Sequence, residues 1–489
     1  MTPPPDPEQR PLRRRAGRCL LAVAPLLVAA PAAAETDFEG AADARLAGEL
    51  ESGRPTVTRR GASLETDDDE RLVLLVGLDA QAYLGDHVDL GARVDTGDLT
   101  WARGADFTIG GVPPGTEAQE TGFLREAWVG FEVGDEVVGR LEAGKHRLTL
   151  GDGLLLDGYG LGASAGVDTP VIEARAGLAW IGAELRPSGP PLLFAEFGAR
   201  LGDTLHLGLL WARDTGFAEE ARDEIEAQID LRALQTALAR ERAGRTALDC
   251  LDPPLAVTLD STLHWLGATA EAEWTGGRAS ATWLTGFGEL GVSARLQNET
   301  CIEFLERRGR PTERAQRLDV LGHAASAEAR HHVGGPFYPG LFALWLRGDD
   351  EGGEYDGFLA IAPYPVRPAL FFDVGATTSL RTQRAATPGV LGHGLRAVGP
   401  TLLFAPTEDF SADLTLAWLA ADTPNPATGG STYGQEVDVR LDLDLARSVS
   451  LFGEAAVARL GDFYAPAGGT HLRIALGVSA EARTSHDDD

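Results

Sequence analysis

Few residues in this sequence have the types and spacing that catalysis or metal binding requires. The chain contains no phosphate-binding loop, no His-Glu-x-x-His zinc motif and no paired-cysteine metal site. His331 and His332 are adjacent, so a strand would point them to opposite faces, and neither Ser293 nor His206 belongs to an ordered catalytic pattern. The sequence therefore predicts no catalytic residue, no metal site and no cofactor, and we do not expect an enzyme.

Charged residues do recur at a fixed spacing, in alternation with apolar ones. Between Glu436 and Leu445 every second residue is Val or Leu, and every residue between them is Asp, Glu or Arg. Successive side chains of a strand point to opposite faces, so this segment has one apolar and one charged face. The same contrast recurs over 88–95, 205–212 and 472–479. A helical period of 3.6 residues would scramble it, which excludes a helical domain for most of the chain.

Segments of about ten alternating residues are typical of strands that cross a membrane at a tilt. No apolar run after residue 34 is long enough for a transmembrane helix. A closed barrel is the other arrangement that pairs every backbone amide in lipid. We therefore predict an all-β fold, a transmembrane antiparallel up-and-down barrel of about 18 strands. Sixteen or twenty strands also fit, and a soluble β-sandwich or solenoid is the alternative.

In such a barrel the polar faces point into the lumen. The predicted pore-lining residues are Asp89, Arg93, Asp95, Glu126, Glu132, Arg140, Glu142, His146, Asp373, Glu436, Asp438, Arg440, Asp442, Asp444, Glu454 and Arg473. Acids outnumber bases in this set, and rings of carboxylate favour cations over anions. Pairing of Asp with Arg across strands in a filled interior is the other interpretation. The net charge of −30 makes nucleic acid an improbable partner.

Connections between the segments are of two lengths, as in barrels with short periplasmic turns and longer external loops. Tight turns are predicted at Gly85-Asp86, Gly134-Asp135, Thr275-Gly276-Gly277 and Ala446-Arg447-Ser448. Long connections are predicted at 104–121, 151–168, 216–256, 297–314 and 422–433. Trp101, Trp128, Trp180, Trp211, Trp265, Phe463 and Tyr464 lie near predicted strand ends, where some should form the interfacial aromatic girdles.

The first 34 residues have the order of a secretory signal peptide. Basic residues from Arg10 to Arg18 precede an apolar run that ends at Ala32-Ala33-Ala34. We therefore expect cleavage after Ala34 and a mature barrel of residues 35–489 in the outer membrane of a Gram-negative bacterium, in contact with its lipid. Residues 217–256 form a predicted helical insert in an external loop, because apolar residues recur at helical spacing between Phe217 and Arg242. Cys250 and Cys301 are expected to form a disulfide between external loops.

Several segments resemble the alginate-export family of outer-membrane porins. They are Leu124–Val129, Leu141–Leu148 and Gly151–Leu155, together with Gly434–Val439 and Gly461–Tyr464 near the end of the chain. The resemblance implies an eighteen-stranded barrel that conducts a hydrophilic solute, which for the best-known members is an acidic polysaccharide guided by lumen arginines. Where that family tends to have Gly-Arg-Gln, this chain has Gly144-Lys145-His146, and its predicted lumen is acidic.

Three hypotheses of function follow. The favoured one is a porin for passive diffusion of small hydrophilic solutes, preferably cationic or neutral. The second is a substrate-specific or polysaccharide-export channel, which the family resemblance implies. The third is a filled barrel that serves adhesion or envelope structure. The sequence leaves the solute, the openness of the lumen and the formation of a homo-oligomer undecided.

Overall fold

A computed structural model describes most of the chain after residue 35. The described residues are 36–53, 55–58, 61–64, 69–85, 87–96, 98–102, 108–110, 123–181, 190–216, 256–295, 313–349, 354–361, 392–426, 428–446, 448–464 and 468–484. The predicted signal peptide, the helical insert, Cys250, Cys301 and Asp373 lie outside these residues, so those predictions stand as they were made. No helix of the described part is long and apolar enough to cross a membrane.

The described chain is built from strands. Their bounds are β1 (Thr36–Ser52), β2 (Pro55–Thr58), β3 (Gly61–Leu64), β4 (Asp69–Leu84), β5 (Val88–Asp95), β6 (Asp98–Ala102), β7 (Thr108–Gly110), β8 (Phe123–Val133), β9 (Val138–Leu150), β10 (Leu156–Asp168), β11 (Ile172–Ile181), β12 (Leu192–Leu201), β13 (Leu205–Asp214), β14 (Ala256–Trp274), β15 (Gly277–Arg295), β16 (Glu313–His331), β17 (Phe337–Leu346), β18 (Leu395–Thr407), β19 (Phe410–Ala420), β20 (Thr432–Ala446), β21 (Val449–Leu460) and β22 (Thr470–Thr484).

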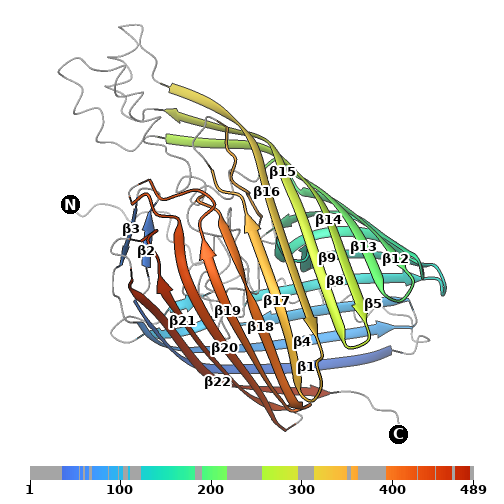
Figure 1. The fold of residues 1–489 in the computed structure, drawn as a ribbon. Coiled ribbons are helices and arrows are strands. Elements are labelled where there is room, and N and C mark those ends of the chain that lie inside the picture. The colour runs from blue at the N-terminus through green and yellow to red at the C-terminus, as the bar shows by residue number, and fades with distance from the viewer. Residues whose placement is uncertain are drawn as a thin grey trace, which may run out of the picture.

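Eighteen of these strands form one closed antiparallel barrel, which confirms the predicted fold class and the favoured strand number (Figure 1). Each strand pairs with its neighbours along the chain, and the last strand returns to the first. β1 pairs with β22 from Gly40↔Thr484 to Ser52↔Leu472, and with β4 on its other side. Strands β6 and β7 extend the sheet beside β4, and β2 and β3 form a separate hairpin.

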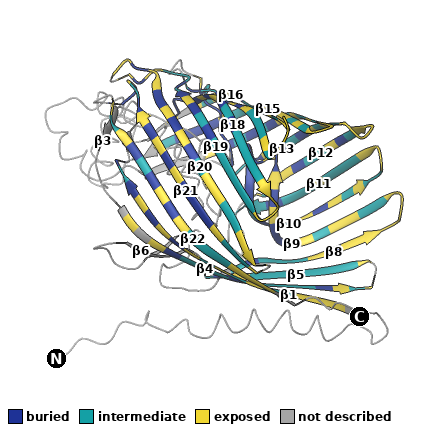
Figure 2. Ribbon diagram, turned by 60° about the horizontal axis from the view of Figure 1, so that its bottom comes forward, coloured by how far each residue is buried: buried dark blue, intermediate teal, exposed yellow. Residues whose placement is uncertain are grey.

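The two faces of the barrel have opposite character. On β22, Ile474 and Leu476 are exposed on the outside, whereas Arg473 and Ala475 are each only 1% exposed on the inside. Residues paired across neighbouring strands share a face, so the same alternation continues on β1 and β21. Leu476 pairs with Gly48 and Val478 pairs with Leu451, all on the outer face. Exposed and buried residues alternate along the strands in the same way around the wall (Figure 2).

Both ends of the described chain lie at the end of the barrel that has the short turns. Connections of only two to five residues join β4 to β5, β8 to β9, β10 to β11, β12 to β13, β14 to β15, β16 to β17, β18 to β19 and β20 to β21. All four predicted tight turns are among them, and Thr36 pairs with Leu84 next to the first. The connections at the other end are longer, apart from the one between β9 and β10.

The prediction of a long connection over 151–168 is wrong. Only residues 151–155 connect β9 to β10, and Leu156–Asp168 is a strand. Gly151, Asp152 and Gly153 all have positive φ, which allows the chain to reverse direction within a few residues. The glycine-rich composition of Gly158–Gly166 suggests a loop, but glycines are also common where a strand bends away from a sheet.

The end of the β9–β10 hairpin leaves the wall of the barrel. β8 pairs with β9 only as far as Lys145, and β10 pairs with β11 only from Gly160 onward. The two strands nevertheless pair with each other out to Leu150↔Leu156. The hairpin end, which we define as residues 146–159, therefore has no neighbouring strand on either side.

The hairpin end packs inside the barrel against the opposite strands. A Cβ added at Gly151 would lie 3.2 Å from Leu284 of β15 and 3.4 Å from Leu210 of β13. Leu155 accepts a backbone hydrogen bond of 2.9 Å from Ile361, and Trp265 of β14 donates to the Leu359 carbonyl at 2.8 Å. The hairpin end and segment 354–361 thus share a hydrophobic core with the inner faces of β11–β20, in which Leu155, Leu284 and Phe358 are fully buried.

The apolar outer face provides the first test. Leu209 on β13 is 62% exposed and lies about midway between the two ends of its strand. We expect Leu209→Arg to lower the free energy of unfolding by roughly 2–4 kcal/mol in lipid, because a charge at mid-height would face the hydrocarbon. Denaturant titration of the protein refolded in vesicles, followed by tryptophan fluorescence, measures it.

The matched control is Asp442→Arg, at a similar height but on the inner face of β20. Asp442 is half-exposed and pairs with Arg440 at 3.3 Å, so its replacement should cost no more than about 1 kcal/mol. Equal losses in the two variants would contradict the assignment of the faces.

Candidate functional site

The register places the predicted pore-lining residues opposite the apolar outer face. Asp89, Arg93, Glu126 and Glu142 are partly buried and His146 is buried. The other ten described members fall into two groups by depth. Glu132, Arg140, Arg440, Asp442 and Asp444 lie toward the short-turn end and are half-exposed or exposed. Asp95, Glu436, Asp438, Glu454 and Arg473 lie farther from that end and are buried. Their role in lining a pore remains a prediction.

The buried charges are paired within the barrel. Arg473 on β22 donates to Glu454 on β21 at 2.7 Å, and His471 contacts Glu51 of β1 at 2.8 Å. Removing one partner of such a pair leaves an uncompensated buried charge, which costs several kcal/mol. These pairs therefore hold the inner wall of β1, β21 and β22 in one arrangement.

Arg125 is an inward-facing cation that strict alternation does not predict. The register between β5 and β8 shifts between Arg93↔Glu126 and Val94↔Leu124, so Arg125 is the extra residue of a β-bulge. Its guanidinium donates to both carboxylate oxygens of Asp95, at 2.8 and 3.0 Å, and lies 5.7 Å from the Tyr159 ring centroid. No local sequence signal distinguishes this bulge from the regular strand around it.

Two further cations lie where the hairpin leaves the wall. The Lys145 ammonium donates to the Leu124 carbonyl at 2.8 Å, and Arg147 forms a bidentate pair with Asp157 at 2.7 and 2.8 Å. Gly144, which precedes them, has φ +131°, and a Cβ there would lie 2.2 Å from the Ala127 carbonyl oxygen. The Gly144-Lys145-His146 segment thus forms the base of the hairpin end, where only glycine fits at 144.

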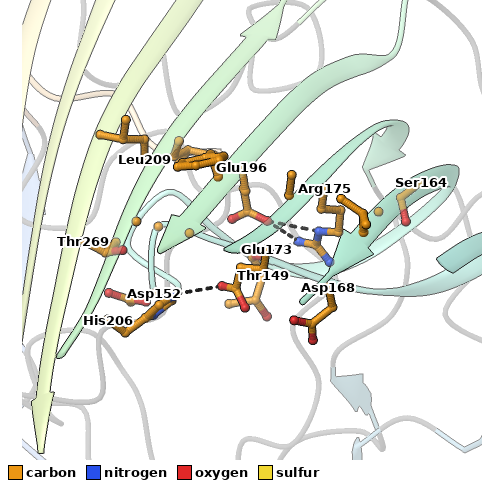
Figure 3. A pocket seen from close by; sticks show the side chains of 18 of the residues that line it. Thr149, Asp152, Ser164, Asp168, Glu173, Arg175, Glu196, His206, Leu209 and Thr269 are labelled. Atoms are coloured by element: carbon orange, nitrogen blue, oxygen red, sulfur yellow. Dashed lines mark hydrogen bonds and ion pairs between the residues drawn. The ribbon is translucent and has the colours of Figure 1, made fainter. Parts of the chain in front are cut away.

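A cavity of about 410 Å³ lies between the hairpin end and the inner wall of β9–β14 (Figure 3). Thr149 and Asp152 line it from the hairpin, and Asp152 accepts a hydrogen bond from Thr282 of β15. The ionisable side chains that line it are Arg140, Glu142, Asp152, Asp168, Glu173, Arg175, Glu196, His206 and Glu271. Of these, only Arg140 and Glu142 belong to the predicted pore-lining set. The alternation of apolar residues with Glu173 and Arg175 on β11 could have identified others.

Carboxylates dominate this cavity. Arg175 pairs with Glu196 at 2.7 Å, and His206 contacts Glu173 at 2.9 Å. Arg200, just beyond the lining, bridges Glu173 and Asp168 at 2.9 and 3.3 Å. Among the described residues, no cation pairs with Asp152 or Glu271. The cavity therefore has a net negative charge and two carboxylates that are available to a positively charged solute.

Ser164 also lines this cavity, within the letters Gly-x-Ser-x-Gly of Gly162–Gly166. A nucleophile elbow requires a sharp turn between a strand and a helix. Here the five residues lie inside β10, and they pair regularly with β9 and β11. Ser164 contacts no histidine among the described residues, so this match in letters does not reproduce the geometry of a nucleophile.

Aromatic side chains form two belts on the outer face. Trp274, Phe337, Phe404 and Phe410 lie near the short turns, whereas Trp180, Trp211, Trp283, Trp345 and Trp418 lie farther along their strands. Eight residues separate Phe337 from Trp345 and Phe410 from Trp418. At a tilt near 40° this is roughly 20 Å, close to the height of an apolar membrane band. We call the second group the long-loop girdle.

The predicted girdle residues divide between the two faces. Trp180 and Trp211 lie on the outer face as predicted. Trp265, Phe463 and Tyr464 do not belong to a girdle, because they are buried in the core inside the barrel. Trp128 does not belong to one either, because its ring packs over Gly91 on the inner face. The side chain of Trp101 lies outside the description. Distance from a strand end does not fix the face on which a residue lies, so only part of the set forms a girdle.

The comparisons with known proteins find similar barrels but no relatives in sequence. No protein-family model matches the chain, and no curated protein matches it. The alginate-export resemblance thus gains no support. The solved structure of OccAB4 from Acinetobacter baumannii has a TM-score of 0.49 and 11% identity, and the match covers 93% of this chain and 100% of that one.

Two structures from Pseudomonas aeruginosa are similar to the same degree. OpdO has a TM-score of 0.47 and 12% identity, with 91% of this chain and 97% of that chain covered. OpdK, solved with vanillate, has a TM-score of 0.47 and 11% identity, with 92% and 99% covered. At these scores and identities no argument about the solute or the site follows from the likeness.

The contact between the hairpin and the wall can be tested directly. Thr282→Val removes the hydroxyl that donates to Asp152, which should weaken the attachment of the hairpin end by about 1 kcal/mol. Hydrogen exchange of peptides covering 148–158 should then be about fivefold faster. Thr282→Ser keeps the hydroxyl and should exchange like the wild type, and unchanged exchange in the valine variant would refute the anchoring role.

Proposed function

We propose that the chain is an outer-membrane channel for passive diffusion of small hydrophilic solutes, with preference for cationic or neutral ones. The observation that carries the proposal is a closed barrel with an apolar outside and a charged inside. The outer face has two aromatic belts at the spacing of a membrane's apolar band. Such a cylinder is stable in lipid, because its wall leaves no strand edge exposed.

The charge of the cavity supports a preference for cations. A solute that crosses the barrel on the β9–β14 side passes Glu142, Asp152 and Glu271, and it meets few cations that are not already paired. Fixed carboxylates raise the local concentration of cations and lower that of anions. Asp152 belongs to the hairpin end, so the hairpin both narrows the lumen and contributes charge. No step of this proposal requires a catalytic group.

The alternative of polysaccharide export has less support. An acidic polymer needs cations along its path, but Arg125, Arg147, Arg175 and Arg473 are each bound to a carboxylate of the wall or hairpin. A polyanion would have to displace those carboxylates. Loss of polymer secretion on deletion of the gene, restored by the intact gene, would support export over the proposed function.

A filled structural barrel is favoured by one observation. The hairpin end and segment 354–361 pack into a hydrophobic core inside the barrel, and this core reaches the inner faces of β11–β20. If it closes the lumen, the protein would not conduct. Zero conductance of correctly folded protein would therefore favour this second candidate.

Ion selectivity in planar bilayers tests the proposed function. We expect single channels with a reversal potential of the sign that cations produce in a KCl gradient. Glu271→Gln should reduce the cation-to-anion permeability ratio by about two- to threefold, from the Coulomb energy of one carboxylate several ångströms from the path.

Asp260→Asn is the matched control. Asp260 lies on the same strand, β14, but it is exposed on the outer face of the barrel. Its neutralisation should leave the permeability ratio unchanged. Anion preference of the wild type, or equal effects of the two substitutions, would contradict the proposal.

A further inference from the structure

The outer face of the barrel carries a basic and aromatic patch at the long-loop girdle of β13–β18. Arg213 on β13 is exposed and pairs across the strands with His264 on β14. Arg396 on β18 is 64% exposed. Between them lie His323 on β16 and two tryptophans, so we define the patch as Arg213, His264, Trp283, His323, Trp345 and Arg396.

The middle of the patch is a preformed aromatic surface. The Trp283 ring centroid lies 5.7 Å from that of His323 and 5.6 Å from that of Trp345. The Trp283 indole donates to Thr285 at 3.1 Å, and Thr285 in turn contacts His323 Nδ1 at 3.1 Å. These contacts fix the orientation of the rings, although the Trp283 side chain remains 46% exposed.

Arg396 is held in place and keeps donors for another partner. Its Nε donates to Asp422 Oδ1 at 2.8 Å, and the Trp345 indole donates to the same oxygen at 3.0 Å. A guanidinium has five N–H donors, of which the carboxylate engages only part. Arg213 has no ion pair with any described residue. The two arginines therefore present exposed donors on either side of the aromatic surface.

The position of these cations is asymmetric along the barrel axis. Each member of the patch lies about seven to twelve residues from its strand's short turn, which is roughly 20–30 Å along the axis at a tilt near 40°. Nearer the short turns, the described outer faces of β13–β18 carry Leu, Val, Ala, Gly, Pro and aromatic residues together with His331, and neither arginine nor lysine. Outward-facing arginine thus occurs where the leaflet on the long-loop side has its headgroups.

We propose that this patch binds the phosphorylated saccharide headgroup of a lipid in the leaflet on the long-loop side. Guanidinium groups bind phosphate with paired, charge-assisted hydrogen bonds. The faces of Trp283 and Trp345 offer apolar surface to the sugar rings, and the acyl chains lie along the leucine-rich wall below. The inference rests on the membrane placement in the proposed function, but it does not depend on conduction through the lumen.

Lipid titration of the detergent-solubilised mature protein, followed by native mass spectrometry, tests the proposal. The probes are a bis-phosphorylated acylated glucosamine disaccharide and the same lipid without its phosphates. We expect the phosphorylated lipid to bind more tightly. Each of Arg213→Gln and Arg396→Gln should weaken its binding about fivefold, since a basic residue near an anionic lipid contributes about 1 kcal/mol.

Arg459→Gln is the matched control. Arg459 is exposed on the outer face of β21 at a similar distance from the short turns, but it has Gln435 and Thr470 as cross-strand neighbours instead of the histidines and paired tryptophans. Its replacement should leave the affinity within twofold of the wild type. Heat-modifiable migration on gels confirms that each variant is folded.

Three results would overturn the proposal. They are equal binding of the two lipids, unchanged affinity in the double variant Arg213→Gln/Arg396→Gln, and an equal loss in Arg459→Gln. A second copy of the chain bound through the patch, and lost in the double variant, would assign the surface to self-association instead. Because conductance is measured separately, a selective channel without lipid binding would remove only this inference. Failure to insert into bilayers would remove the proposed function.

Discussion

The structure depends on one constraint, that every backbone amide of the wall finds a partner within the wall. An open sheet would leave two edges of unpaired N–H and C=O groups, each costing several kcal/mol in lipid. Pairing between β1 and β22 removes both edges, over thirteen residue pairs from Gly40↔Thr484 to Ser52↔Leu472. Closure also fixes which residues face inward, because a slip of one residue would move every side chain to the opposite face.

The hairpin end does not pair with the strands of the wall, so this constraint does not keep it there. Its backbone pairs only within the β9–β10 hairpin, so its apolar side chains have no lipid to face and turn inward instead. Leu148, Leu150 and Leu156 are buried in the barrel interior, where they belong to the same hydrophobic core as residues of segment 354–361. Because the hairpin end lies inside the barrel, Asp152 reaches Thr282 on β15, and residues of the hairpin line one side of the cavity. The geometry of the candidate site therefore follows from a local departure from the wall.

The wall was largely predictable from the sequence. Each strand faces lipid on one side and the polar interior on the other, so apolar and polar residues alternate along it. The segments 88–95, 436–445 and 472–479 show the predicted faces, and the tight turns lie where Gly-Asp and Gly-Gly pairs indicate them. The interior was less predictable. The strand pattern of Val138–Leu150 contains one sign that its last residues leave the wall, because Leu148 and Leu150 are in phase with the inward-facing Glu142. Arg147 and Thr149 are in phase with Leu141 and would face lipid if the strand stayed in the wall. The bulge at Arg125 and the inward face of Trp265 depend on register, which is set by neighbours far apart in the sequence.

The central claim, that lipid contacts one face of each strand and water the other, is tested most directly by a cysteine scan along β20. The chain for this measurement carries Cys250→Ser and Cys301→Ser, with single cysteines at Arg440, Leu441, Asp442, Leu443, Asp444 and Leu445. In vesicles, we predict that a membrane-impermeant maleimide labels the even-numbered positions, and that a lipid-bound nitroxide quenches fluorophores attached at the odd-numbered ones. Equal labelling and quenching at all six positions, or the reverse pattern, would contradict the account.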